Sequence, residues 1–329
     1  MLDSLKFAFD SVSPIILTVA IGYMLKKIGL MTADFSKAAN KLVFRVFLPT
    51  MLFMNIYSIG NIADINLGYV IYSAVFVLCV FLLAIPAVRL FTPKDERRGV
   101  LAQSFFRSNY ALIGIPLASS LFGSEGAIIA TLLSAVLIPL FNVLAVISLC
   151  LFRKGRDFKG LKGVFIGILK NPLIIGIVIG LVALAIRALL VRCEISWRIS
   201  EVSAIYETLK YIASLATPMA LLTLGAQFEF SAISDLRREI ILGTLVRSLI
   251  VPALALGIAY FAFGDRFGGA HFAAFVAAFC TPVAVSSVPM AQEMDADATL
   301  AGQLVVFTTL GSAFSVFIAS FILSVVNVF

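Results

Sequence analysis

Charged residues are scarce in this sequence, and their scarcity decides the class of protein. Only 13% of the 329 residues are Asp, Glu, Lys or Arg, while 61% are hydrophobic and the mean hydropathy is +1.07. Soluble domains carry about a quarter charged residues, so this composition excludes a soluble core. The chain has room for about ten membrane spans of roughly 20 residues each, and we expect an all-α membrane protein embedded in a lipid bilayer.

Histidine and cysteine are also rare, which excludes the common metal and disulfide sites. The single histidine is His271, and the four cysteines show no spacing typical of zinc ligands or of a disulfide framework. The sequence contains neither a His-Glu-x-x-His nor a Gly-x-Ser-x-Gly pattern, so we do not expect an enzyme. We expect no metal and no cofactor; only a coupling H⁺ or Na⁺ remains as an inorganic partner.

The basic residues lie mainly in short connections between apolar windows. The net charge of +7 therefore indicates membrane topology and no nucleic-acid partner. The stretch up to Gly29 lacks a small-residue cleavage pattern, so we expect it to be the first span and not a signal peptide. We predict ten spans, at 11–28, 36–57, 67–91, 98–121, 125–152, 164–190, 205–228, 238–262, 270–292 and 299–327.

Positive charge clusters after the odd-numbered windows. Lys26, Lys94, Arg153 and Arg237 each belong to such a cluster, whereas the second and fourth connections carry Asp64 and Glu125. By the positive-inside rule, the odd connections lie in the cytoplasm and both termini lie outside, in the periplasm of a cell with an inner membrane.

The polar stretch 153–163 divides the chain into five windows before it and five after it. We expect 1–152 and 164–329 to be two five-helix repeats joined by a cytoplasmic linker. Because five is odd, the second repeat must be inverted relative to the first. Proline occurs at matching places, Pro49 with Pro218 and Pro116 with Pro289. Inverted repeats with interrupted helices are the architecture of many secondary transporters.

Two windows contain residues that interrupt helices. In the fourth, Gly114 and Pro116 predict a break, because proline cannot donate a backbone hydrogen bond and glycine leaves helical geometry easily. In the ninth, the predicted break runs from Pro282 to Pro289, with hydroxyl groups between the two prolines and Gln292 and Glu293 near the cytoplasmic end. Freed carbonyls, hydroxyls and helix ends are suited to binding a small cation or an anion.

The sequence resembles the auxin efflux carrier family, which includes plant PIN-formed carriers and bacterial permeases. The ordered motifs that carry the resemblance cover nearly the whole chain: Leu48-Pro49, Asn109 followed by Gly114-Ile115-Pro116-Leu117, Asn171-Pro172-Leu173, Thr217-Pro218-Met219-Ala220-Leu221, and Pro282 followed by Ala291-Gln292-Glu293. The resemblance implies ten spans in two inverted repeats, a scaffold part and a transport part, and fourth and ninth helices that cross at the substrate site. It also implies that homodimers form, as in plant members.

Carried over by position, Asn109 matches the family asparagine that contacts the substrate carboxylate, and Pro116 and Pro282 match the crossing point. Plant members have a second proline where this chain has Ser287, so the break in the ninth helix is expected to differ. The chain also lacks the long hydrophilic loop of the long-loop plant carriers. It is therefore expected to be a compact bacterial member that transports small carboxylates such as malate or malonate.

Several charged residues lie inside the apolar windows. Arg107 lies about 13 Å into the fourth window and is suited to binding a carboxylate, although it could instead snorkel to the surface or pair with an acid. For Arg45 and Arg247 we expect snorkelling or structural pairing. Glu293 is the candidate for a coupling cation or proton, with a solvated helix end as the alternative. The full set of predicted substrate-binding residues is Asn109, Arg107, Ser108, Gly114, Pro116, Pro282, Ser286 and Ser287, with Glu293 and Gln292 for coupling.

Taken together, these observations predict a secondary transporter of a small organic anion, either a mono- or dicarboxylate such as malate or malonate or an auxin-like acid. We expect elevator-type alternating access, in which the transport part moves against the scaffold. The alternative is a sodium-coupled bile-acid-type symporter or a cation/proton antiporter with the same crossed-helix fold. An antiporter would favour paired aspartates beside the crossing, and the sequence has none there.

Overall fold

The computed structural model describes residues 2–58, 67–152, 169–195 and 197–329, with the side chains of 2–12 and 111 left aside. Every regular element in this described part is helical, which confirms the predicted all-α class. Within these described residues, six helices are long and apolar enough to cross a membrane; they span Leu67–Phe91, Leu112–Leu151, Pro172–Arg192, Ser203–Gln227, Ala232–Arg266 and Ala298–Val325. The helices at the windows 11–28, 36–57, 98–121 and 270–292 are not separate members of this set, although the window 11–28 lies within a single helix of 26 residues, Leu2–Lys27. The predicted linker 153–163 lies outside the described residues.

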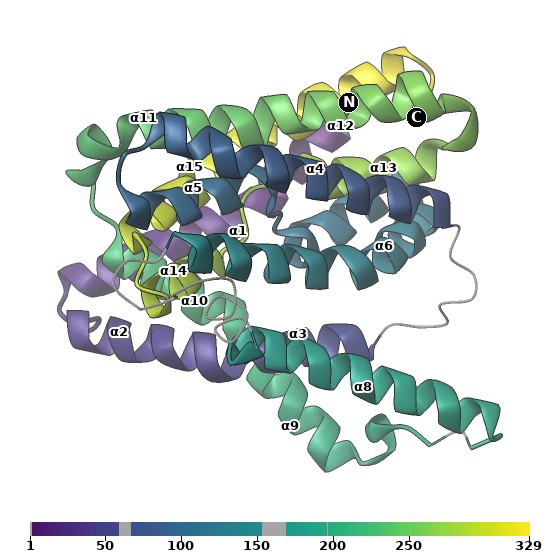
Figure 1. Cartoon of the computed structure of the whole chain (residues 1–329), viewed down its shortest axis with the longest axis horizontal. Helices are drawn as coiled ribbons and strands as arrows, with labels where there is room; N and C mark the ends of the chain where they lie inside the picture. The colour runs from purple at the N-terminus through teal and green to yellow at the C-terminus, as the bar shows by residue number, and fades with distance from the viewer. Residues whose placement is uncertain (1, 59–66, 153–168, 196) are drawn as a thin grey trace.

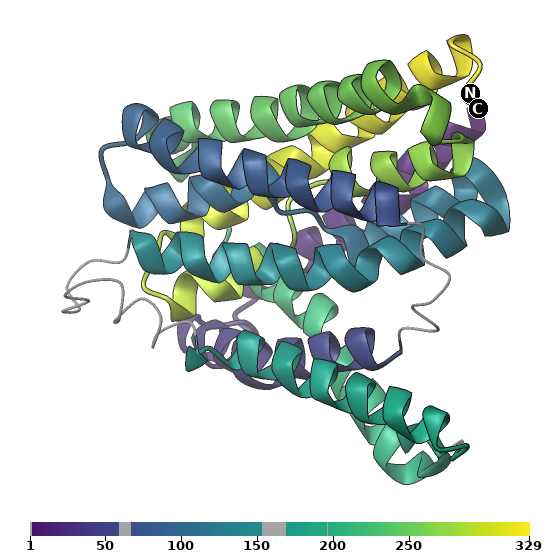
Figure 2. The ribbon, with the colours of Figure 1, turned by 45° about the vertical axis from the view of Figure 1, so that its right-hand side comes forward.

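The helices form two groups according to which neighbours they pack against most closely. The first group is α1 (Leu2–Lys27), α2 (Ala33–Leu42), η1 (Val43–Phe47), α3 (Leu48–Tyr57), α8 (Pro172–Arg192), η4 (Ile199–Glu201), α9 (Ser203–Ser214) and α10 (Ala216–Gln227). Within it, α1 packs on α10, and α3 packs on α8 and α9. In Figures 1 and 2, α3, α8 and α9 form a separate layer at the lower edge of the molecule.

The second group contains the larger, more densely packed block of helices. Its members are α4 (Leu67–Phe91), α5 (Asp95–Phe106), η3 (Tyr110–Gly114), α6 (Ile115–Leu151), α11 (Ala232–Leu245), η5 (Val246–Ile250), α12 (Val251–Phe263), η6 (Gly264–Arg266), α13 (Gly269–Phe279), α14 (Ser287–Glu293) and α15 (Ala298–Val325). Inside α6, Phe122 and Gly123 are not helical, and Gly123 has a φ of +60° that glycine adopts easily. This kink lies between the predicted fourth and fifth spans.

Glycines allow the central pair of helices, α1 and α10, to approach at backbone distance. A Cβ atom added to Gly225 would lie 1.9 Å from the Val19 carbonyl oxygen, and one added to Gly22 would lie 2.2 Å from that of Leu222. Small residues at helix interfaces are the usual way in which membrane helices pack closely, because lipid gives no hydrophobic drive for association.

Three turns of π-helix occur in the described part, and each is followed by a proline at the second residue of the next helix. A proline ring crowds the carbonyl four residues earlier and offers no N–H to it. A π turn bonds five residues back and removes that conflict. The three cases are Val43–Phe47 before Pro49, Tyr110–Gly114 before Pro116, and Val246–Ile250 before Pro252.

These turns correct one prediction. We expected the helix of the fourth window to break at Gly114–Pro116, but both residues lie within continuous helical backbone. The π turn accommodates Pro116 without a break. The interruption lies earlier, between the end of α5 at Phe106 and the start of η3 at Tyr110. Gly114 has a packing role instead, since a Cβ there would lie 2.9 Å from the carbonyl oxygen of Ala277 on α13.

The α1–α10 contact yields a stability prediction. Gly225→Ala should push the two helices apart and lower the unfolding free energy by about 1–3 kcal/mol, the usual cost of overpacking. Differential scanning fluorimetry of purified protein in detergent would show a lower melting temperature. Gly257→Ala is the matched control, because nothing lies within 4 Å of its added Cβ. An unchanged melting temperature for Gly225→Ala would contradict the close packing.

Candidate functional site

Two helices stop inside the second group of helices, and the two interruptions contact each other. The first consists of residues 107–109, where Arg107 has extended backbone (φ −80°, ψ 119°). The second consists of residues 280–286, between α13 and α14. It contains Pro282, as predicted, whereas Pro289 lies in the first turn of α14, where a missing N–H is tolerated.

Three hydrogen bonds join the two interruptions. The backbone N–H of Asn109 donates to the carbonyl of Pro282 at 2.8 Å. The hydroxyl oxygens of Ser108 and Thr281 lie 2.6 Å apart, and Arg107 donates to the Ser286 hydroxyl at 2.7 Å. The predicted residues Arg107, Ser108, Asn109, Pro282 and Ser286 are therefore brought together from positions more than 170 residues apart in the chain.

Arg107 is the charged residue at this contact. It is only 1% exposed and donates to Gln103 Oε1 at 3.0 Å, to Asn142 Oδ1 at 2.9 Å, and to Ser286. All of these partners are neutral, and no carboxylate of the described residues forms an ion pair with Arg107. It neither snorkels to the surface nor pairs with a scaffold acid. A buried cation without an opposite charge is costly, which makes it a candidate for binding an anion.

Hydrogen-bonding groups without a protein partner occur in and next to the interrupted segments and on the Arg107 partner Gln103. The Asn109 side-chain nitrogen, the Gln103 side-chain nitrogen and the Ser287 hydroxyl are buried and unpaired. The orientation of the Gln103 amide follows from its neighbour: because arginine only donates, the amide oxygen must face Arg107, and the amide nitrogen must face away. The two unpaired amide nitrogens are donors, whereas the Ser287 hydroxyl can donate or accept. Buried groups of this kind usually bind water or a ligand.

Arg247 holds the ends of both interrupted helices. It is fully buried and donates to three main-chain carbonyls: Phe106 at the end of α5 (3.3 Å), and Ala278 and Thr281 at the end of α13 (3.0 and 2.9 Å). These carbonyls have no next helical turn to bond to. Of the two alternatives expected for this residue, snorkelling or structural pairing, the structure shows structural pairing.

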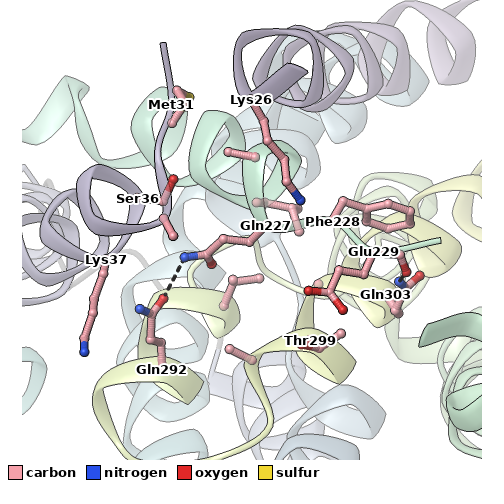
Figure 3. A pocket seen from close by; sticks show the side chains of 16 residues that line it. Lys26, Met31, Ser36, Lys37, Gln227, Phe228, Glu229, Gln292, Thr299 and Gln303 are labelled. Carbon is pink, nitrogen blue, oxygen red and sulfur yellow. Dashed lines mark hydrogen bonds between the residues drawn. The ribbon is translucent and has the colours of Figure 1, made fainter. Parts of the chain in front are cut away.

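A polar cavity of about 360 Å³ lies beside α14 (Figure 3). It is lined by the last turn of α1, by α2, by the end of α10, and by Val288 and Gln292 on α14. Gln227 Nε2 donates to Gln292 Oε1 at 3.2 Å, the dashed line in Figure 3. The fully buried Asn40 donates its side-chain N–H groups to the side-chain oxygens of Gln227 and Gln292. Its own side-chain oxygen accepts a hydrogen bond from the Thr223 hydroxyl at 2.7 Å.

A second, mostly apolar cavity of about 750 Å³ lies beside the other interrupted helix. It is lined by Leu112, Ile113 and Pro116, and by residues of α1, α3, α9 and α10. On α1 it reaches Pro14–Thr18, whereas the polar cavity reaches Lys26, about 12 Å or more farther along the helix. The two cavities therefore lie at different heights along α1.

The predicted coupling residues lie near the end of α14. Glu293 pairs with Arg45 of η1, at an N–O distance of 3.4 Å, so this ion pair joins the two groups of helices. The Gln292 oxygen already accepts two hydrogen bonds. The sequence analysis did not identify Asn142 and Thr281 as residues of the site. Their only signal is that they are polar residues in apolar windows.

The polytopic helical fold, with a buried cation and two cavities beside interrupted helices, defines a membrane transporter. The chain belongs to the membrane transport protein family, that of the auxin efflux carriers, whose sequence pattern matches residues 7–320. It is 25% identical to an uncharacterized transporter of Methanocaldococcus jannaschii over 255 residues, which cover 75% of this chain and 77% of that protein. It is 24% identical to an uncharacterized transporter of Methanothermobacter thermautotrophicus over 316 residues, 93% of this chain and 95% of that protein. The predicted resemblance and the prediction that the chain is not an enzyme are confirmed.

The Arg247 contacts yield a second prediction. Arg247→Met should leave three buried carbonyls unpaired and destabilise the fold, at about 1–3 kcal/mol for each orphaned group. Arg237→Met is the control, because Arg237 is an exposed arginine on the same long helix. Size-exclusion profiles and melting temperatures in detergent measure the difference. Equal stability of the two variants would contradict a structural role for Arg247.

Proposed function

We propose that this protein is a secondary transporter of a small organic anion, a mono- or dicarboxylate such as malate or malonate or an auxin-like acid. The anion binds where residues 107–109 meet residues 280–286. The observation that carries the proposal is the buried Arg107 guanidinium, which has only neutral partners among the described residues. A carboxylate would supply the missing negative charge.

Neighbouring groups would complete the anion site. The side-chain nitrogens of Asn109 and Gln103 can donate to carboxylate oxygens, the Ser108 and Ser286 hydroxyls lie on the same two segments, and Ser287 follows as the first residue of α14. Pro282 leaves the second segment non-helical, and Gly114 lets α13 approach. Pro116 lines the apolar cavity next to it. The surplus of donors favours an anion over a cation at this position.

For the mechanism we propose elevator-type alternating access. The two groups of helices support it, because the first contains windows 1, 2, 6 and 7 and the second contains the remaining windows. This division assigns equivalent helices of two five-helix repeats to the same group, as expected for ten spans in inverted repeats at 1–152 and 164–329. The fourth and ninth helices would cross at their interruptions. The two cavities, one beside each interrupted helix, would be the two access routes.

For coupling we propose Glu293, with Gln292 beside it, as the place where a proton or a cation acts. The Arg45–Glu293 ion pair joins the two groups, so protonation of Glu293 would release a contact between them. Transport without coupling, and the sodium-coupled alternative, differ in whether sodium or pH should change the stabilisation by substrate. We further propose an inner-membrane location with both termini outside, and a homodimer. Figures 1 and 2 show both chain ends at one end of the bundle, which supports the shared side of the termini.

The site proposal predicts the effect of two substitutions. Arg107→Ala and Asn109→Ala should each abolish uptake of labelled malate or malonate into proteoliposomes, because one removes the charge and the other a donor. Folded protein should still be recovered, as judged by size-exclusion chromatography. Arg237→Ala, at an exposed arginine, is the control and should transport normally. Normal transport by both site variants would refute the site.

A ligand screen tests the substrate class and the coupling. Purified protein should be stabilised by RT ln(1 + [L]/Kd) when a true substrate binds, or by about 2.7 kcal/mol at a hundredfold excess over Kd. Thermal-shift measurements with carboxylates, with and without sodium and across pH, would reveal it. A stabilisation that appears only with sodium would favour the sodium-coupled alternative. A stabilisation that depends on pH in the wild type, but not in Glu293→Gln, would favour coupling to protons.

A further inference from the structure

We propose that the polar cavity is a second anion-binding site, in which the carboxylate binds before it reaches Arg107. This inference rests on the proposed function and extends it to a residue outside the interruptions, Lys26.

The cavity wall carries a surplus of positive charge. Among its lining residues, Lys26 and Lys37 are cationic and Glu229 is the acid. In Figure 3, the Lys26 side chain extends from the end of α1 toward Gln227. Neither lysine forms an ion pair with an acid in the described parts of the chain. A concave wall with excess charge of one sign concentrates the opposite ion and raises its association rate.

The amide cluster gives the cavity a fixed donor. The Gln292 oxygen accepts hydrogen bonds from Asn40 and from Gln227, so its amide nitrogen is the group left for a ligand. Figure 3 shows that nitrogen pointing away from Gln227. Asn40 is fully buried, and its own oxygen accepts from Thr223. The orientation is therefore set by a buried network, and ammonium and amide N–H groups together suit a carboxylate.

The helix α14 connects this cavity with the first site. Val288 and Gln292 lie four residues apart, on one face of α14, and both line the cavity. The helix begins at Ser287, next to the Ser286 hydroxyl that accepts a hydrogen bond from Arg107. From Gln292 to Ser286 the rise along a helix is about 9 Å. An anion that leaves the polar cavity would therefore travel only a short distance along α14 before it reaches Arg107, whose charge has no acidic partner.

The apolar cavity lacks this property. Its one charged lining residue among the described residues is Lys210, which lies 3.6 Å from Glu207, so its charge is offset. Of these two cavities, only the polar one is therefore suited to recruiting an anion by charge. This asymmetry supplies a matched control, because both lysines are exposed and line a cavity, but only Lys26 has no acid partner in the described chain.

The test is the kinetics of labelled malonate uptake into proteoliposomes that contain the full chain. Lys26→Gln should raise KM about fivefold at low ionic strength without changing the maximal rate, as expected for one lost charge a few ångströms from the anion. The KM of the wild type should rise with salt, whereas that of the variant should rise less. Lys26→Arg should restore the low KM, and Lys210→Gln should leave it unchanged.

The outcomes separate this inference from the proposed function. If Lys26→Gln has the wild-type KM at low salt while Asn109→Ala abolishes uptake, the second site is refuted and the first stands. An equal rise of KM in Lys210→Gln would also refute it, because the effect would then not belong to the polar cavity. If the wild-type protein neither transports nor binds any carboxylate, both proposals fail.

Discussion

Main-chain groups that lose their helical partners inside an apolar protein must find new partners, and this structure is organised around that requirement. Two helices end inside the second group, at Phe106 and Phe279. Arg247 satisfies carbonyls at both ends, and the Asn109 N–H bonds directly to the Pro282 carbonyl. In lipid, non-helical backbone is tolerated only where protein or water supplies such partners. The interruptions are therefore stabilised by their contacts with each other and with the buried guanidinium of Arg247.

The buried arginines differ in how their charge is balanced. Arg97 joins α5 to α11 and α15 through ion pairs with Asp235, Glu239 and Asp297. Its charge is therefore balanced by acids, and its role is to hold these helices together. Arg247 faces carbonyls at two helix C-termini, where the helix dipoles place partial negative charge. Arg107 has only neutral amides and a hydroxyl. The same residue type thus serves as clamp, cap and candidate ligand, and only its surroundings distinguish the three.

The sequence allowed the helical class, the membrane setting, the family and the break at Pro282 to be predicted, because these depend on composition and on local motifs. It placed the other break incorrectly, at Gly114–Pro116. Proline disrupts an α-turn, but the chain can absorb it in a π turn, and no local pattern separates these outcomes. Arg107 and Asn109 could be singled out as polar residues in an apolar window. Ser286 could also be singled out, but its contact with Arg107 and the Asn142 partner could not be predicted, since both depend on the fold.

The distance along the chain between Arg107 and Ser286, 179 residues, has a consequence for biosynthesis. A ribosome adds about 5–20 residues each second, so the fourth window would emerge roughly 10–40 seconds before its last partner is made. During that time Arg107 has no Ser286, and the carbonyl of Phe106 has no Arg247. Until the second half is inserted, these groups need other partners, such as water. The first half of this chain, expressed alone, would leave Arg107 and the Phe106 carbonyl without these partners.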